Sequence, residues 1–188
     1  MNEIIRCGVY PQENSEPIPV EWLVLEQEQN TALVVSRYVL TGSAFNEEDK
    51  PVKWRESSLR AWLNRDFWSL AFTPGEQSRI LTSPAENKPN FHYRTGGDEP
   101  TEDKVFVLSY DEAVKYFKDD DRRRALPTSY AAENGAWRGI GGYSWYWLRT
   151  NARLGDCICR VRDLGSVSVD GVVCSALGGV RPAMRIRL

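Results

Sequence analysis

Apolar runs of strand length alternate with short polar breaks in the first part of the chain. Residues 4–10 predict a first strand, and the polar, proline-bearing stretch 14–19 predicts a loop. Residues 21–26 and 31–36 are apolar runs separated by a short polar segment, which predicts a β-hairpin. Residues 41–43 are expected to be a link to the next element.

The spacing of apolar residues then changes to that of a helix. Leu59, Trp62 and Leu63 fall at positions i, i+3 and i+4, which places them on one helical face. Phe67, Leu70 and Ala71 continue this apolar surface, with a break expected near Asn64.

Two capping boxes predict further helix starts. Thr73 and Glu76 form one box around Pro74, and we expect its helix to run to about Leu81. Ser109 and Glu112 form the other. An apolar stripe follows it at Tyr110, Ala113, Val114 and Phe117.

The segments around these helices differ in polarity. Residues 82–104 form a long polar stretch rich in proline and glycine, which predicts a functional or mobile loop. Residues 105–108 are apolar and predict a buried strand. Residues 119–124 are three aspartates followed by three arginines, a pattern typical of a solvated helix end or turn.

The C-terminal part returns to strand patterns. Trp145, Trp147 and Arg149 alternate with apolar neighbours, as on a strand. Residues 180–188 predict the last strand. Turns are expected at Gly165, Gly171 and Gly178–Gly179.

Length and charge limit the class of protein. A chain of 188 residues is ordinarily one domain, so we expect a single domain over residues 1–188. The net charge of −2, with interspersed signs, argues against a nucleic-acid partner. No apolar stretch has the length of a membrane helix, and residues 1–6 lack the pattern of a signal peptide. These observations favour a cytoplasmic protein with no membrane partner.

The cysteines are few and unevenly placed: Cys7, Cys157, Cys159 and Cys174. Cys157 and Cys159 would share one face of a strand. The sequence lacks paired zinc knuckles, and its single histidine, His92, lies in the polar stretch. We therefore expect buried free thiols in a reducing compartment, and no metal or cofactor. A Cys157–Cys174 bridge across neighbouring strands is the alternative.

The sequence contains no catalytic set. A triad would have to use His92, in a loop poorly suited to hold a base near a nucleophile. No phosphate-binding glycine motif is present, because the glycines at 139–142 lack the Lys-Ser/Thr that such a motif needs. We therefore expect a protein that is not an enzyme.

Short motifs follow one another along the chain at residues 8–12 (GVYPQ), 21–25 (EWLVL), 54–64 (WRESSLRAWLN), 103–109 (DKVFVLS), 147–149 (WLR) and 179–183 (GVRPA). In this order they resemble a bacterial family of unknown function, domain-of-unknown-function family 6273, from about residue 7 to residue 188. In its C-terminal half that family is similar to the C-type-lectin-like fold, which sulfatase-modifying enzymes and retroelement variable proteins also use.

The resemblance implies an α+β fold of C-type-lectin-like type, with a twisted antiparallel sheet, two or three flanking helices and long loops that build a ligand surface. It also implies that Arg149 and Arg181 satisfy buried carbonyls or carboxylates. Residues 88–90 (KPN) and 99–101 (EPT) depart from the calcium motif of lectins, so binding would be calcium-independent. The spacing of Cys157 and Cys159 departs from that of the sulfatase modifiers, and the chain lacks the asparagine-rich stretch of the variable proteins.

Aromatic and arginine side chains near the 147–149 motif indicate a recognition surface, since these residues commonly anchor interfaces. The candidate ligand-binding residues are Trp137, Tyr143, Trp145, Thr150, Asn151, Arg153, Arg160 and Asp163, with Arg162 beside them. The first hypothesis is a non-catalytic domain that binds a protein, peptide or glycan. The alternatives are a cysteine- or metal-dependent oxidase-like enzyme and a structural or assembly module.

Overall fold

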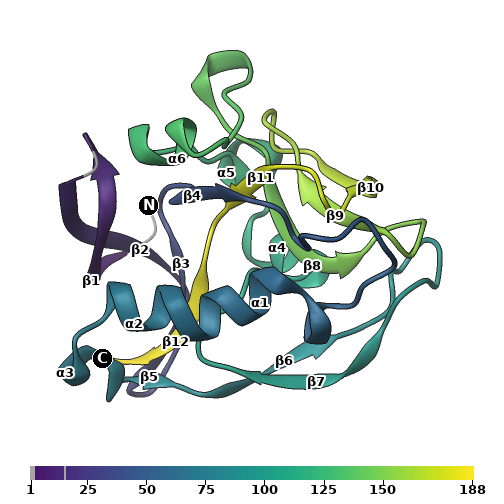
Figure 1. The fold of residues 1–188 in the computed structure, drawn as a ribbon. Coiled ribbons are helices and arrows are strands. Elements are labelled where there is room, and N and C mark those ends of the chain that lie inside the picture. The colour runs from purple at the N-terminus through teal and green to yellow at the C-terminus, as the bar shows by residue number, and fades with distance from the viewer. Residues whose placement is uncertain (1–2, 15) are drawn as a thin grey trace.

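The computed structural model describes residues 3–14 and 16–188, and it shows a mixed α+β protein built from curled, mostly antiparallel sheets (Figure 1). One five-stranded sheet has the order β1-β2-β3-β12-β5, and a second has the order β10-β9-β8-β11-β4. A short ribbon of β6 and β7 forms a third. One pairing, β11 with β8, is parallel. We refer to the two large sheets as sheet A and sheet B.

Sheet A consists of β1 (Ile4–Glu13), β2 (Glu16–Glu28), β3 (Thr31–Ser36), β12 (Ala183–Arg187) and β5 (Ile80–Leu81). The predicted loop at 14–19 is mostly strand, because residues 16–19 pair with β1. Ser15 lies outside the described residues. Met1 and Asn2, which belong to the segment expected to lack a signal-peptide pattern, also lie outside them. β3 is buried along almost its whole length between β2 and β12, which explains its continuous apolar run.

Sheet B consists of β10 (Val167–Val173), β9 (Cys157–Val161), β8 (Tyr146–Asn151), β11 (Gly178–Val180) and β4 (Thr41–Ser43). The predicted link at 41–43 is therefore an edge strand. Gly171 lies at a register shift inside β10 and Gly178–Gly179 lie inside β11, so neither marks the expected turn. Gly171 has a φ of 74°, which favours glycine at this bulge.

The predicted last strand is two strands in different sheets. β11 ends at Val180, β12 begins at Ala183, and the chain passes from sheet B to sheet A between them (Figure 1). Arg181 lies at this crossing with its side chain buried, where Nε donates to the Ser36 carbonyl at 2.9 Å. Its guanidinium also reaches the hydroxyl of Tyr146 at 3.1 Å. The expectation that Arg181 satisfies buried carbonyls is confirmed.

The helices are short. They are η1 (Trp54–Glu56), α1 (Ser58–Trp62), η2 (Leu63–Phe67), α2 (Trp68–Ala71), α3 (Pro74–Gln77), α4 (Tyr110–Tyr116), α5 (Asp120–Arg123), α6 (Ser129–Glu133) and η3 (Ile140–Gly142). Segment η2 is a π-helical turn near the expected break. Both capping boxes are confirmed, but α3 ends at Gln77 because residues 80–81 pair with β12 instead. Leu70 and Val114 are exposed, contrary to their assignment to apolar stripes.

The polar stretch 82–104 is ordered, contrary to the expected loop. β6 (Ser83–Asn87) and β7 (Asp98–Asp103) pair with each other. Asn90 is buried in the connection, where its side-chain Oδ1 accepts from the backbone N–H groups of His92 and Tyr93. Hydrogen bonds of polar side chains therefore help to fix this segment, and the spacing of apolar residues in the sequence does not reveal them. Residues 105–108 are buried but form an isolated bridge at Phe106 rather than a strand.

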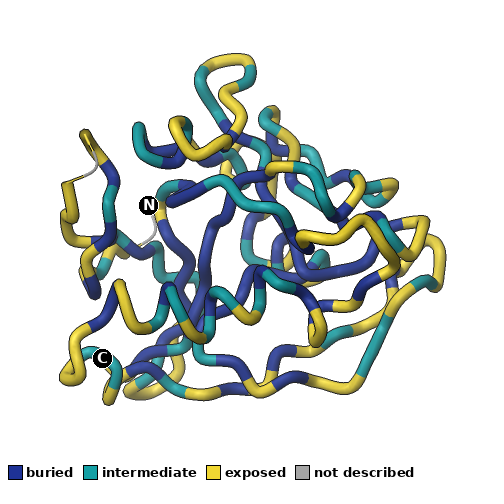
Figure 2. The backbone as a smooth tube through the Cα atoms, viewed as in Figure 1, coloured by how far each residue is buried: buried dark blue, intermediate teal, exposed yellow. Residues whose placement is uncertain are grey.

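One hydrophobic cluster includes residues from both large sheets and from the helices (Figure 2). Trp22, Trp54 and Trp147 are among its largest fully buried side chains. Asn64 joins two of the sequence motifs here, because its amide donates to the Val105 carbonyl at 2.8 Å and accepts from the Lys104 backbone at 2.8 Å. The exposed aromatic side chains among the described residues lie on loops, with Trp137 on the loop 134–143 and Phe91 and Tyr93 on the connection between β6 and β7.

Candidate functional site

The predicted site residues do not form one surface. Trp145 lies just before β8, whereas Thr150 and Asn151 end that strand. A strand rises about 3.3 Å per residue, so the two ends are separated by roughly 20 Å. The expectation of a single surface beside the 147–149 motif therefore differs from the structure.

The residues at the far end of β8 have structural partners. Asn151 is buried, and its side-chain amide donates to the Val52 carbonyl at 2.8 Å. The hydroxyl of Thr150 accepts from the Tyr110 backbone at 2.9 Å. Arg153 is exposed on the β8–β9 loop, with its guanidinium 5.7 Å from the ring centroid of Tyr93.

Four of the predicted residues do meet at the other end of β8. Trp137, Trp145, Arg160 and Asp163 line one open pocket of about 260 Å³ together with Arg162. We call these five residues the aromatic–arginine pocket. Tyr143 lies nearby on the same loop as Trp137, below the guanidinium of Arg124 at 5.4 Å, and does not line the pocket.

The ring of Trp145 is fixed by its neighbours. It meets Trp147 edge-on, with ring centroids 4.9 Å apart and an interplanar angle of 83°. On another side it lies against β11, where a Cβ added at Gly178 would be 2.3 Å from the indole. Glycine is therefore required there for the ring to approach the strand. Sequence reasoning missed this role of Gly178, because a glycine pair reads as a turn.

Arg160 extends from β9 over the exposed side of this indole. Its guanidinium carbon lies 4.8 Å from the Trp145 ring centroid, within the range of a cation–π contact. Its Nε is buried and has no hydrogen-bond partner in the part of the chain that the structure describes. Burial lowers the pKa of the Arg160 guanidinium, the charge of Arg162 lowers it further, and Asp163 opposes both effects.

Asp163 ties the loop 134–143 to sheet B. Its Oδ2 accepts from the backbone of Ile140 at 3.2 Å. Gly139 permits this approach, since a Cβ there would clash with the carboxylate. Trp137, on the same loop, keeps 61% of its surface exposed. The pocket thus combines one fixed aromatic ring, one exposed ring and two arginines.

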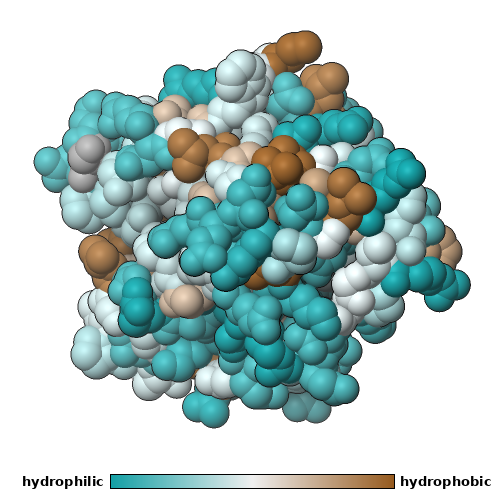
Figure 3. Space-filling model, turned by 45° about the vertical axis from the view of Figure 1, so that its right-hand side comes forward, coloured by the Kyte–Doolittle hydropathy of each residue, from teal (hydrophilic) through white to brown (hydrophobic). Residues whose placement is uncertain are grey.

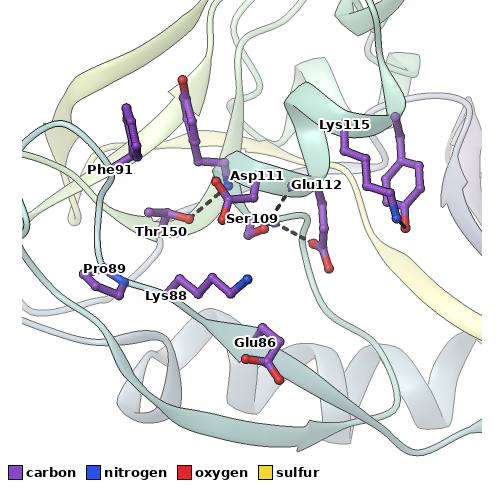
Figure 4. Close-up of a pocket in the computed structure, with 11 residues that line it drawn as sticks. Glu86, Lys88, Pro89, Phe91, Ser109, Asp111, Glu112, Lys115 and Thr150 are labelled. Atoms are coloured by element: carbon purple, nitrogen blue, oxygen red, sulfur yellow. Dashed lines mark hydrogen bonds between the residues drawn. The ribbon is translucent and has the colours of Figure 1, made fainter.

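A second cavity, of about 320 Å³, lies between β6, the connection to β7 and helix α4 (Figure 4). Lys88, Asp111, Lys115 and Thr150 are among its lining residues. Glu112 at its edge caps α4 and forms a bidentate pair with the buried Arg149, at 2.6 and 3.0 Å. Arg149 also donates to the buried Val107 carbonyl at 2.8 Å, so the expectation that it satisfies buried carbonyls or carboxylates is confirmed. The lining charges are of both signs, so they indicate no particular ligand.

All four cysteines are free and buried. Burial raises the pKa of Cys159 to about 12 and that of Cys7 to about 11. Burial and the nearby Asp156 also raise the pKa of Cys157. Thiolates are the nucleophilic and metal-binding form of cysteine, so these thiols are poorly reactive in the folded protein.

Two further features bear on the class of protein. Among residues 3–14 and 16–188, no group of three or more histidine, cysteine or acidic side chains is arranged to hold a metal ion. Within the same residues, no helix is long and apolar enough to cross a membrane.

The family with the description "Domain of unknown function (DUF6273)" matches residues 29–188. The match covers more than half of the chain, so the chain belongs to this family. It begins later than the predicted start near residue 7, which leaves all of β1 and β2 outside it. No curated protein and no solved structure matches the chain.

Proposed function

We propose that this protein is a non-catalytic, calcium-independent binding domain that recognises its ligand through the aromatic–arginine pocket. The observation that carries the proposal is the guanidinium of Arg160, which lies on the Trp145 ring with its Nε buried and unpartnered. The buried Nε is closed to a ligand, whereas the terminal nitrogens of the same guanidinium would donate to an acceptor in the open pocket.

The chemistry of the pocket supports recognition rather than turnover. Tryptophan and arginine are enriched among the residues that contribute most binding energy at interfaces. Asp163, the one carboxylate in the pocket, already accepts from the backbone of Ile140. The proposal includes a C-type-lectin-like fold, which the loops around the pocket support. It also includes a cytoplasmic location, which the four free thiols support.

The cysteine-dependent alternative has less support. The thiols of Cys7 and Cys159 are buried with raised pKa values, so little thiolate forms near neutral pH. The assembly alternative rested on a polar loop that would order on a partner, and that segment is already paired as β6 and β7.

Affinity capture from a lysate of the source organism tests the proposal. The native protein is compared with Trp145→Ala/Arg160→Gln, a variant that removes both stacked groups. Arg153→Gln is the matched control, because Arg153 is an exposed arginine at the other end of β8. Far-ultraviolet circular dichroism and a urea midpoint establish that each variant is folded.

We expect a ligand that the native protein and Arg153→Gln retain and the double variant loses. Retention by all three proteins would place the binding surface elsewhere. Loss with Arg153→Gln alone would favour the β8–β9 loop instead.

A further inference from the structure

The positive charge in the aromatic–arginine pocket is not balanced. Arg160 takes part in none of the ion pairs of the described residues, and its Nε has no acceptor among them. Arg162 donates only a 3.3 Å contact to the hydroxyl of Ser168. Asp163 is the single acidic residue of the pocket, and one of its oxygens is bound to the loop. Two cations thus face one partly occupied anion.

We propose that the pocket binds a peptide segment of a partner protein in which a carboxylate side chain lies beside an apolar one. This inference rests on the proposed function and adds the chemical class of the ligand. The carboxylate would accept from the two terminal nitrogens of Arg160, which, unlike the buried Nε, a ligand in the pocket can reach. The apolar neighbour would lie on the exposed ring of Trp137.

The geometry of arginine favours a carboxylate. The guanidinium presents parallel N–H donors that match the two carboxylate oxygens, and such bidentate pairs are stronger than neutral hydrogen bonds. The guanidinium carbon of Arg160 lies 4.8 Å from the Trp145 ring centroid, and this contact restricts the side-chain rotamers before the ligand arrives. A preorganised donor loses less conformational entropy on binding.

The surroundings of the pocket favour a peptide over a glycan. Trp137 and Ile140 on the loop 134–143 are 61% and 72% exposed, and Leu164, next to Asp163, is also exposed. In Figure 3, which is turned about the vertical axis from Figure 1, most of the apolar surface residues lie in the upper half of the molecule. The loop 134–143 also lies in the upper half, as Figure 1 shows. Aliphatic side chains offer contact area to apolar groups and no donors to sugar hydroxyls.

Selection from a displayed library of random linear peptides tests the ligand class. The immobilised proteins are native, Arg160→Gln, Arg160→Lys and Trp145→Ala. Arg65→Gln is the matched control, because Arg65 is an exposed arginine on η2 and does not line the pocket. The same proteins are applied to an array of acidic and neutral glycans. Urea midpoints show which variants stay folded, and Arg160→Lys keeps the charge if Arg160→Gln does not fold.

We expect peptides recovered on the native protein to be enriched in Asp or Glu next to an aromatic or aliphatic residue. Their affinity should fall about thirtyfold or more with Arg160→Gln, as when one partner of a desolvated charge pair is removed. Arg160→Lys should lose part of the affinity, and Arg65→Gln none.

Each other outcome overturns the inference. Neutral peptides that are lost with Trp145→Ala would refute the carboxylate but leave the binding domain intact. Capture of glycans alone would refute the peptide class. Peptides that bind native protein and Arg160→Gln equally, or no enriched peptide at all, would refute the role of Arg160.

Discussion

The indole nitrogen of Trp54 donates a 2.8 Å hydrogen bond to Asp103, a carboxylate without exposed surface. Arg60 donates to the other carboxylate oxygen at 2.7 Å, and Thr101 donates to the first at 2.7 Å. The bonds connect η1 and α1 to the end of β7. The two longest sequence motifs therefore meet at one buried acidic group, which makes it a structural anchor of the fold.

Asp103→Ala should lower the free energy of unfolding by about 3–5 kcal/mol, because it leaves the Arg60 guanidinium and the Trp54 indole without their acceptor. Urea unfolding followed by tryptophan fluorescence measures the change. Asp66→Asn is the control, since the Asp66 side chain keeps 41% of its surface exposed and pairs with its neighbour Arg65. Equal losses for the two variants would contradict the anchoring role.

The Glu112–Arg149 pair should make stability depend on pH. Burial alone would raise the pKa of Glu112, but the charge and hydrogen bonds of Arg149 outweigh it, so the pKa is lowered. The folded pKa thus lies below the unfolded value of about 4.3, and the stabilisation is complete above that value. It is lost as the pH falls through the folded pKa.

Urea midpoints between about pH 6 and about pH 3 measure this effect. Glu112→Gln should be less stable near neutral pH and should lose less stability on acidification. The exposed Glu133→Gln should follow the native curve. Parallel curves for native protein and Glu112→Gln would show that the pair does not couple stability to protonation.

The buried thiols should resist alkylation. With a pKa of about 12, Cys159 is thiolate in only about one molecule in ten thousand at pH 8. We expect iodoacetamide to label all four cysteines in urea without reductant and to label the native protein far more slowly, as mass spectrometry would record. Two unlabelled cysteines in urea would instead support a Cys157–Cys174 bridge.

Gly178→Ala should disturb the aromatic–arginine pocket by displacing the ring of Trp145 from β11. The new methyl group would overlap the Trp145 ring, so the ring must move at a cost of about 1–3 kcal/mol. The near-ultraviolet circular dichroism of the tryptophans should change, and ligand affinity should fall. Gly75→Ala is the control, because nothing lies within 4 Å of a Cβ at that position. An unchanged spectrum would show that Trp145 is not held against β11.

Local signals in the sequence identified the hairpin of β2 and β3 and both helix starts. Apolar alternation and capping boxes depend on contacts within a few residues, so they can be recognised in the sequence without knowledge of the tertiary structure. The crossing at Arg181 could not be predicted, because strand spacing does not tell which sheet a strand joins. The ordered structure of residues 83–103 depends on hydrogen bonds of Asn90 and Asp103. Such polar contacts produce no periodic pattern of apolar residues in the sequence, so the sequence did not predict them.

The candidate site was predicted in part for the same reason. Trp137, Trp145, Arg160 and Asp163 were selected by residue type. The β8–β9 pairing brings Arg160 beside Trp145, and the hydrogen bond from Ile140 to Asp163 holds the loop of Trp137 next to them. Asn151 and Arg153 are near Trp145 in sequence but lie at the opposite end of an extended strand. A strand is extended, so residues a few positions apart along it lie far apart in space. Residues that look close within a short sequence motif can therefore lie at opposite ends of a strand.

Indole nitrogen–proton NMR signals test the binding role of the pocket most directly. Seven tryptophans give well-separated probes, and those of Trp22 and Trp54 are bonded inside the protein as internal references. During titration with the most enriched peptide, we expect saturable shifts for Trp137 and Trp145 that are absent in Arg160→Gln. Stationary Trp137 and Trp145 signals, with shifts at residues lining another surface, would contradict it.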